Sequence, residues 1–374
     1  MTPSIRQDRL TSEFLALAAA SRESLDERLS ADLITEKLHA LGFCVQEDDA
    51  GRALGGNAGN LYGTLSGTRP GPPLLFSAHM DTVAPGNGKH PLLHEDGTVT
   101  SDGTTVLGAD DCAGLAEILE GIRSVREAGI AHRDIEVLFP VAEEIYIRGS
   151  GIFDYSRLRS KEAYVLDMSG AVGSAAVRAP SLISFRVTVT GRASHAGFAP
   201  ENGIHAIRAA AEAIARIPQG RVDADTTSNI GTVSGGTAKN IVPEQCVCTG
   251  EVRSFSHKKA LGRIEEIRAR FREAAAQYGA AVQMETQEIL RSYEVPQEAA
   301  VVRRFRDVCG RLGLPGTLRS TFGGSDNHNF LKAGISGIVL SCGMERVHST
   351  QEHISVQELV RGAALVAGLI TCDD

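Results

Sequence analysis

Imidazole and carboxylate side chains follow a series of hydrophobic segments in the first half of this sequence, and such side chains can bind metal ions. In chain order they are His79 and Asp81, Asp110 and Asp111, Glu143 and Glu144, and Asp167. Successive groups are about 30 residues apart, which is the length of one strand-and-helix unit. Side chains that follow neighbouring parallel strands meet at one edge of the sheet. Carboxylates crowded there repel one another unless cations lie between them, so the spacing predicts a metal site.

Neighbouring residues in this series can have different roles. In an extended segment Glu143 and Glu144 point to opposite sides, so one can bind metal while the other acts as a general base. Asp81 lies on the same side of its segment as His79 and can orient the imidazole ring. Of the paired aspartates, Asp110 is the one expected to bridge two metals through its two oxygens.

Each motif also has a purely structural explanation. An HxD sequence at a strand end is often an ordinary turn, and an aspartate at a helix start can cap the helix. Adjacent glutamates are commonly part of a solvated surface, and a lone aspartate after a strand often forms a turn. The order and spacing of the motifs, taken together, favour the metal site.

The elements expected to position these side chains alternate between strand and helix. Hydrophobic runs typical of buried strands lie at 43–47, 60–66, 73–79, 135–141 and 163–167. Helical periodicity covers 5 to about 43 and 111–128, and it returns at about 297–312 and 355–370, around a strand at 337–342. This order predicts an α/β domain with a mixed, mostly parallel sheet flanked by helices.

A segment of different character interrupts this domain. From residue 181 the sequence SLISFRVTVTG alternates apolar and polar residues, which is typical of a half-buried antiparallel strand. The elements that follow are a helix at about 203–216, strands near 228–234 and 245–254, a helix at 257–278 and a strand at 280–289. Their βαββαβ order is that of a ferredoxin-like domain. We therefore predict a metal-binding catalytic domain at 1–180 and 290–374, with an inserted lid and dimerisation domain at 181–289.

The composition excludes several classes of protein. The chain has 374 residues and a formal net charge of −8, and it has no basic stretch that could form a nucleic-acid surface. No run approaches the roughly 18 apolar residues of a membrane span, and the N-terminal segment has the pattern of an amphipathic helix and not of a signal peptide. The odd number of cysteines, seven, does not indicate a disulfide framework. A cytoplasmic protein is expected, with no nucleic-acid or membrane partner.

The motifs in their order resemble the peptidase T branch of the two-zinc aminopeptidase and carboxypeptidase family. They are HxD, GADD, EE, a strand-end Asp, SHAG at 194–197 and a late His, and the resemblance extends from about residue 60 to the final helix. It implies a metal-dependent hydrolase that cleaves an amide bond in small peptides, using a water that bridges two metals and a glutamate base. It also implies two divalent ions, with zinc expected and cobalt or manganese as alternatives, and a cis peptide bond after the bridging aspartate.

The resemblance assigns a role to each metal-site residue. His79 and Asp167 correspond to terminal ligands of the first metal, Asp110 to the bridging carboxylate, Glu144 to a ligand of the second metal, Glu143 to the general base and Asp81 to the residue that orients His79. Three histidines compete for the last ligand position, namely His328, His348 and His353. We expect His348, because HSTQE at 348–352 matches the family's late H[ST]xxE segment.

Further residues are expected to contact the substrate. By the resemblance His195 stabilises the oxyanion, Asn240 and Arg253 hold the substrate carboxylate, and Gly323, Gly324 and Ser325 line the pocket. An exposed strand position is the alternative explanation for Arg253. The chain departs from the family at Cys112, where lysine is usual, and at Tyr146, where glycine is usual, which puts tripeptide specificity in doubt.

The predicted function is therefore that of a tripeptide aminopeptidase-like enzyme acting on small peptides, which forms a homodimer through the lid. An aminoacylase or carboxypeptidase-type amidohydrolase acting on N-acyl amino acids is an alternative on the same scaffold. A non-catalytic scaffold that keeps metals for stability is a further alternative.

Overall fold

The computed structural model describes residues 3–372, so the outermost two residues at each end of the predicted catalytic domain lie outside the described residues. The chain divides into two compact units. The first contains the chain up to Val177, Glu294–Ser320 and the chain from Gly324 onward, and the second contains Arg178–Tyr293 and Thr321–Gly323. The roles of catalytic domain and lid, with their boundaries, stay a prediction.

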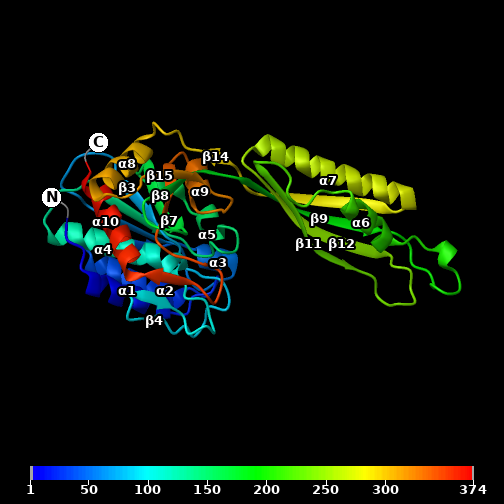
Figure 1. Ribbon diagram of the computed structural model, residues 1–374, viewed down its shortest axis with the longest axis horizontal. Coiled ribbons are helices and arrows are strands. Elements are labelled where there is room, and N and C mark those ends of the chain that lie inside the picture. The colour runs from blue at the N-terminus through cyan, green and yellow to red at the C-terminus, as the bar shows by residue number, and fades with distance from the viewer. Residues whose placement is uncertain (1–2, 373–374) are drawn as a thin grey trace. The chain divides into compact units, whose positions relative to one another are not determined.

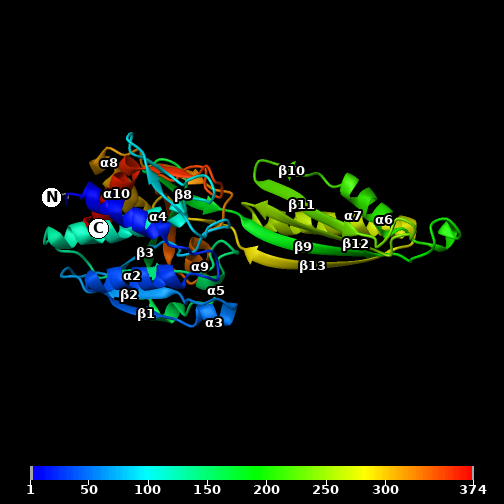
Figure 2. The ribbon, with the colours of Figure 1, turned by 90° about the horizontal axis from the view of Figure 1, so that it is seen from below.

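A nine-stranded mixed sheet forms the centre of the first unit within residues 3–372 (Figures 1 and 2). Its order is β1–β2–β6–β3–β7–β16–β8–β14, with β15 paired to β8. The bounds are β1 (Cys44–Glu47), β2 (Leu61–Leu65), β3 (Leu74–Ser77), β6 (Ile135–Phe139), β7 (Glu162–Met168), β8 (Ser174–Ala179), β14 (Tyr293–Glu294), β15 (Thr317–Ser320) and β16 (Ser336–Ser341). Strands β6, β3, β7 and β16 run parallel, whereas β1, β2 and β8 pair antiparallel. The predicted α/β fold with a mixed sheet is confirmed.

The central parallel strands are buried on both faces, because helices cover the sheet. Every residue of β3 and β6 is buried, and apart from Ser77 and Glu136 these residues are apolar. The helices and helical turns are α1 (Gln7–Ala19), α2 (Arg28–Ala40), α3 (Ala50–Leu54), α4 (Ala109–Glu127), α5 (Arg148–Gly151), η1 (Tyr155–Arg157), α8 (Ala300–Leu312), α9 (Asn327–Lys332) and α10 (Val356–Thr371). Helix α4 packs against α1 and α10 (Figures 1 and 2).

A small antiparallel sheet holds a long loop near the C-terminus in place. Strand β5 (Thr98–Thr100) pairs with both β4 (Leu92–Leu93) and β17 (His353–Ser355). A further bridge between Glu345 and His353 closes the loop that precedes β17. These pairings fix the segment that contains His348.

The second unit has a five-stranded antiparallel sheet of order β10–β11–β12–β9–β13. Its elements are β9 (Ser181–Thr190), η2 (Pro200–Asn202), α6 (Ala206–Ala215), β10 (Gly220–Arg221), β11 (Thr226–Gly235), β12 (Gln245–Ser254), α7 (His257–Tyr278) and β13 (Ala281–Leu290). Helix α7 begins where the Ser256 side chain accepts the Lys259 N–H and ends at Gly279, which has φ +71°. Apolar faces of both helices and of the sheet form one core.

The predicted single helical stretch at 5–43 is interrupted. Residues 20–27 leave the helix between α1 and α2, with Leu25 at φ +76°. The apolar spacing continues through Leu25, so periodicity alone did not show the break. Arg22 and Glu27 within this turn are fully buried.

No helix within residues 3–372 is long and apolar enough to cross a membrane.

Candidate metal centre

The carboxyl ends of three neighbouring parallel strands converge on one place in the first unit. His79 lies two residues beyond β3, Glu143 and Glu144 follow β6, and Asp167 is near the end of β7. Strand β3 lies between β6 and β7 in the sheet, so the side chains that follow these strands are neighbours. The fold therefore brings together groups that are far apart in sequence.

Asp110 lies at the centre of this group. Its Oδ1 atom is 3.0 Å from His79 Nε2, and its Oδ2 atom is 3.2 Å from His348 Nε2. Asp167 Oδ1 lies 3.9 Å from the same His79 nitrogen, and Glu144 Oε2 lies 3.0 Å from the same His348 nitrogen. The Asp110 carboxylate therefore contacts both histidines, and His79, Asp110 and Glu144 form one group whose possible ligand atoms lie close together.

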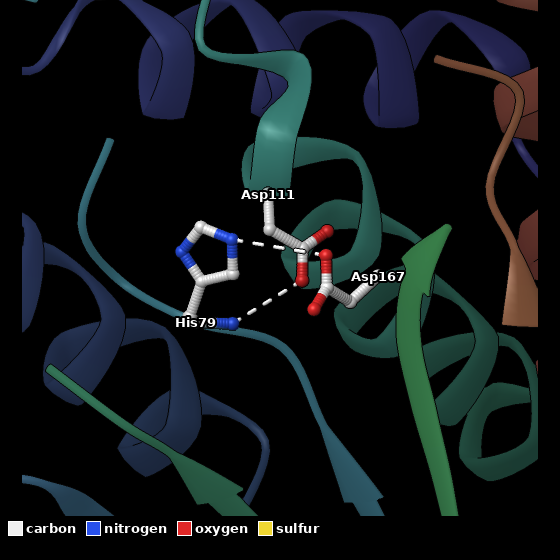
Figure 3. A group of neighbouring side chains, drawn as sticks. All are labelled: His79, Asp111 and Asp167. Carbon is white, nitrogen blue, oxygen red and sulfur yellow. Dashed lines mark hydrogen bonds and ion pairs between the residues drawn. The ribbon is translucent and has the colours of Figure 1, made fainter. Parts of the chain in front are cut away.

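Asp111 also lies in the cluster but has other partners. Figure 3 shows it with His79 and Asp167, and these three side chains form a second set whose ligand atoms are close together. Its Oδ2 atom accepts the backbone N–H of His79 at 3.2 Å, and its Oδ1 atom accepts that of Gly114 at 3.1 Å. Because both oxygens hold backbone groups, Asp111 positions the His79 segment against the start of α4. The peptide bond between Asp110 and Asp111 is cis.

Asp81 connects the histidine to the glutamate pair. Its carboxylate accepts the backbone N–H groups of Glu143 at 2.9 Å and Glu144 at 3.1 Å, and Ser24 Oγ donates to it at 2.6 Å. The Nδ1 atom of His79 lies 3.0 Å from the Asp81 carbonyl oxygen and 3.3 Å from Asp81 Oδ1. Asp81 is thus placed to orient the His79 ring and to fix the backbone of both glutamates.

Buried carboxylates lie close together in the cluster, and burial and mutual repulsion shift their pKa values. Burial and the nearby carboxylate of Asp167 raise the pKa of Glu143 well above its usual range. Burial and the charge of Asp110 likewise raise the pKa of Asp167. Hydrogen bonds to Asp110 and Glu144 raise the pKa of His348 to about 10. Among the described residues, Glu144 Oε1 is buried without a hydrogen-bond partner. Cations among these oxygens would relieve the repulsion and complete the coordination of Glu144.

Backbone conformations that side chains rarely adopt flank the cluster. Ala142, Tyr146 and Ile147 have φ of +54°, +75° and +47°, and Arg346 and His348 have φ of +53° and +60°. Such conformations are unfavourable for residues other than glycine and gather at functional sites, where surrounding contacts enforce them. Tyr146, the departure from the expected glycine, adopts this conformation with an exposed side chain.

Comparison with known proteins identifies the family. The Bacillus subtilis protein YqjE is 37% identical over 366 residues, covering 98% of both chains. The crystal structure of the aminopeptidase PepT from Bacillus cereus has a TM-score of 0.91 and 38% identity, and that of a tripeptidase from Staphylococcus aureus has 0.95 and 33%; each covers 98% of both chains. The chain belongs to the peptidase T-like branch of the dinuclear zinc peptidases. It is a metal-dependent peptidase.

Two domain families also match parts of this peptidase T-like chain. Residues 60–216 match peptidase family M28, and residues 178–279 match the peptidase dimerisation domain. The first match covers the three strand ends that carry His79, Glu144 and Asp167. The second covers most of the antiparallel unit.

The competing histidines differ in their surroundings. His348 contacts Asp110 and Glu144, whereas His328 Nδ1 lies 3.1 Å from the Ser325 carbonyl oxygen and His353 Nδ1 lies 3.1 Å from that of Gln351. This geometry favours His348 as the last ligand.

The residues predicted to contact substrate differ in their exposure and in their hydrogen-bond partners. His195 is exposed in the second unit, and its Nδ1 atom accepts the backbone N–H groups of Gly197 and Phe198, both at 3.1 Å. Asn240 is exposed in the same unit. Arg253 donates from Nε to Glu251 at 2.8 Å and from Nη1 to the Phe322 carbonyl at 2.8 Å. In the other unit, Gly324 is exposed and Ser325 is buried just before α9.

Three residues near this site were not predicted from the sequence. Arg22 and Glu352 hold the backbone around Asp110, and Asp326, whose pKa burial raises to about 6, is buried near Glu143. Glu352 could have been found, because it is the final residue of the HSTQE match. Arg22 could not, because it appeared to lie within a continuous amphipathic helix.

Glu27 should make the stability of the fold depend on pH. Its Oε1 atom accepts the Leu25 and Ala142 N–H groups, and burial raises its pKa from 4.5 to about 7. The folded state thus favours the neutral acid, and stability falls as pH rises from about 4.5 to 7. Glu27→Gln, which stays neutral, should be more stable than wild type by about 2–3 kcal/mol at pH 8 and nearly equal at pH 4.5.

Urea unfolding of the metal-free protein at both pH values measures this difference. Glu95→Gln, at an exposed position, is the control. If the difference in unfolding free energy between wild type and Glu27→Gln were the same at both pH values, the pKa of Glu27 would be equal in the folded and unfolded states, which would contradict this expectation.

Proposed function

We propose that this enzyme is a tripeptide aminopeptidase that uses two zinc ions. The observation that carries the proposal is the Asp110 carboxylate, whose two oxygens contact different histidines and so provide a bridge between two ligand groups. The similarity to a tripeptidase over nearly the whole chain supports the substrate class. The aminoacylase and scaffold alternatives have no comparable support.

His79, Asp110 and Asp167 would hold one ion, and Asp110, Glu144 and His348 the other. Imidazole and carboxylate ligands bind zinc well, and they also bind cobalt and manganese. The choice of zinc therefore rests on the family. When bound, two such ions lower the pKa of water towards neutrality and polarise a substrate carbonyl.

Glu143 is the proposed general base. Its backbone is fixed by Asp81, and its neighbour Glu144 is directed at His348, so the two adjacent carboxylates have separate tasks. Glu143 takes a proton from the attacking water and transfers it to the leaving amine, which must be protonated before it departs. Asp81 keeps the His79 ring in position throughout.

His195 is the proposed donor to the oxyanion that develops on the substrate carbonyl. Since Nδ1 accepts two backbone N–H groups, the proton of the neutral ring must be on Nε2. The ring can therefore donate a hydrogen bond without being protonated. Stacking on Phe198, with ring centroids 4.2 Å apart, limits its rotation.

Replacing His195 by alanine should lower kcat by about 10²–10³-fold, the loss seen when an oxyanion donor is removed. Metal content should not change, because the side chain is exposed and lies outside the ligand groups. Steady-state kinetics with metal analysis measures both, and His90→Ala, at another exposed histidine, is the control. A kcat equal to that of wild type would remove His195 from this role.

Four further residues are proposed to contact the substrate. Asn240 and Arg253 are proposed to hold the substrate carboxylate, and Gly324 and Ser325 to line the pocket. Arg253 already binds Glu251 and Phe322, so only its remaining N–H groups are available. We also propose that residues 181–289 act as a lid and mediate a homodimer, which the dimerisation-domain match supports, and that the protein is cytoplasmic.

A substrate panel tests the proposed activity. Tripeptides with a free amino group should be hydrolysed at the first peptide bond, whereas N-acetylated tripeptides and dipeptides should be poor substrates. Preferential hydrolysis of N-acyl amino acids would instead indicate an aminoacylase. No hydrolysis of any amide, combined with a melting temperature that falls on chelation, would indicate a scaffold.

A further inference from the structure

The backbone that carries Asp110 is held by two buried side chains from distant segments. Glu352 accepts the Gly108 N–H through Oε2 at 2.7 Å and the Asp110 N–H through Oε1 at 2.9 Å. Arg22 donates from Nη2 to the Gly108 carbonyl at 2.6 Å and lies 3.4 Å from the Asp110 carbonyl. We call Arg22 and Glu352 the 108–110 clamp. One carboxylate thus accepts the N–H groups of Gly108 and Asp110, and one guanidinium donates to their carbonyl groups.

The clamp also reaches the other segments that carry ligands. Arg22 donates from Nη1 to the Met80 carbonyl at 3.0 Å, and Met80 stands between His79 and Asp81. Glu352 lies four residues after His348, in the loop closed by the small sheet. The clamp therefore joins the three backbone segments that carry His79, Asp110 and His348.

Both clamp residues are inaccessible to solvent, which makes a role at the surface impossible. Arg22 is 0% exposed and Glu352 is 1% exposed. Charged groups are buried at a high cost unless their hydrogen bonds are satisfied. Here backbone groups at the candidate metal centre satisfy both Glu352 oxygens and both Arg22 Nη atoms, whereas Arg22 Nε has no partner among the described residues. Hydrogen bonds to charged groups are also stronger than neutral ones, so the segment is held firmly.

Gly108 and Lys89 show how closely the clamped segment is enclosed. Gly108 has φ +73°, and a Cβ built on it would lie 3.0 Å from Lys89 Nζ and 3.3 Å from Arg22 Nη2. Lys89 is buried, and its Nζ atom has no hydrogen-bond partner among the described residues. It therefore encloses the segment without holding it, unlike Arg22 and Glu352.

We propose that Arg22 and Glu352 are positioning residues that set the separation between Asp110 and His348, and hence the affinity for the second metal. This inference rests on the two-metal site of the proposed function. Neither residue belongs to the groups of side chains that could hold a metal. Each acts through the backbone of Asp110; Glu352 acts also through its own loop, and Arg22 also through the Met80 carbonyl beside His79.

Loss of the clamp should affect the two metals unequally. Glu352→Ala frees two N–H groups of the Asp110 segment and removes the link to the His348 loop. The second metal should then bind about 10–100-fold more weakly, the usual effect of removing a group that orients a ligand. Binding of the first metal should change much less, because Asp111 and Asp81 still hold the His79 segment. Glu352→Gln, which can still accept one N–H, should recover part of the loss.

Calorimetric titration of the metal-free full-length protein with Zn²⁺ tests the proposal, with thermal unfolding measured in parallel. The matched control is Glu136→Gln, because Glu136 is also fully buried and accepts the backbone N–H groups of Arg159 and Ser160, but at the opposite end of β6. The control should lose stability and keep both metals at wild-type affinity.

The result expected is selective weakening of one of two binding events in Glu352→Ala, with partial rescue in Glu352→Gln. Equal weakening of both events, or the same pattern in Glu136→Gln, would overturn the proposal, because a general loss of stability would then explain it. If Glu352→Ala does not fold, Glu352→Gln decides by the same criterion; Arg22 variants do not, because Arg22 also holds the Met80 carbonyl beside His79. A wild-type protein that binds fewer than two ions would refute the proposed function itself, which is a distinct outcome.

Discussion

Glu143→Gln should lower kcat by about 10²–10⁴-fold while both metals remain bound. Glutamine keeps the size of the side chain and cannot accept a proton from water. The metal ligands are untouched, since Asp81 holds residues 143 and 144 through their backbone N–H groups. KM should change little, because the lost interaction belongs to the chemical step. Steady-state kinetics and mass-spectrometric metal analysis of the same sample measure the two effects.

Two outcomes would contradict the role of Glu143. One is activity close to that of wild type at saturating metal, which would mean that another group accepts the proton. The other is loss of one metal in Glu143→Gln, which would make Glu143 a ligand and would require Glu144 to be reassigned. The neighbouring variant Glu144→Gln is the useful comparison, since it should lose the second metal.

Asp110→Ala should have the largest effect of any single substitution, with a loss of roughly 10⁴-fold or more in kcat. Asp110 contacts both His79 and His348, so its removal takes a ligand from each metal at once. Metal binding should weaken at both sites, in contrast with the selective effect expected for the clamp variants. Titration calorimetry and kinetics at increasing metal concentration check this expectation.

Asp102→Asn is the control for Asp110, because it alters an exposed aspartate in the same unit whose partner is Thr104. It should retain wild-type metal content and kcat. If Asp110→Ala still bound two metals tightly, Asp110 could not be the bridging carboxylate, and Asp111 would be the next residue to test.

The architecture was largely predictable from sequence, because its core elements have strong local patterns. Strands β3, β6 and β7 are short and mostly apolar, and α7 begins at a serine cap and ends at a glycine. The convergence of His79, Glu143, Glu144 and Asp167 was expected from their spacing, since side chains that follow neighbouring parallel strands lie at one edge of the sheet. Their roles came from the resemblance to the family.

What sequence could not supply depends on contacts between distant segments. Strand β8 has the sequence SAAVRA, which carries little strand signal, and it is a strand because β16 pairs with it. Arg22 and Glu352 are charged residues of the kind usually found at the surface, and only the folded chain shows them on the Asp110 backbone. For the same reason the sequence did not show that Arg253 binds Glu251 and the Phe322 carbonyl, contacts that compete with its predicted role.

Anomalous X-ray diffraction at the zinc absorption edge, from crystals of the zinc-loaded enzyme, measures the metal positions directly. Two peaks are expected about 3.5–4 Å apart, one among His79, Asp110 and Asp167 and the other among Asp110, Glu144 and His348. A single peak, or two peaks that do not share Asp110, would contradict the bridged pair on which the proposed catalysis depends.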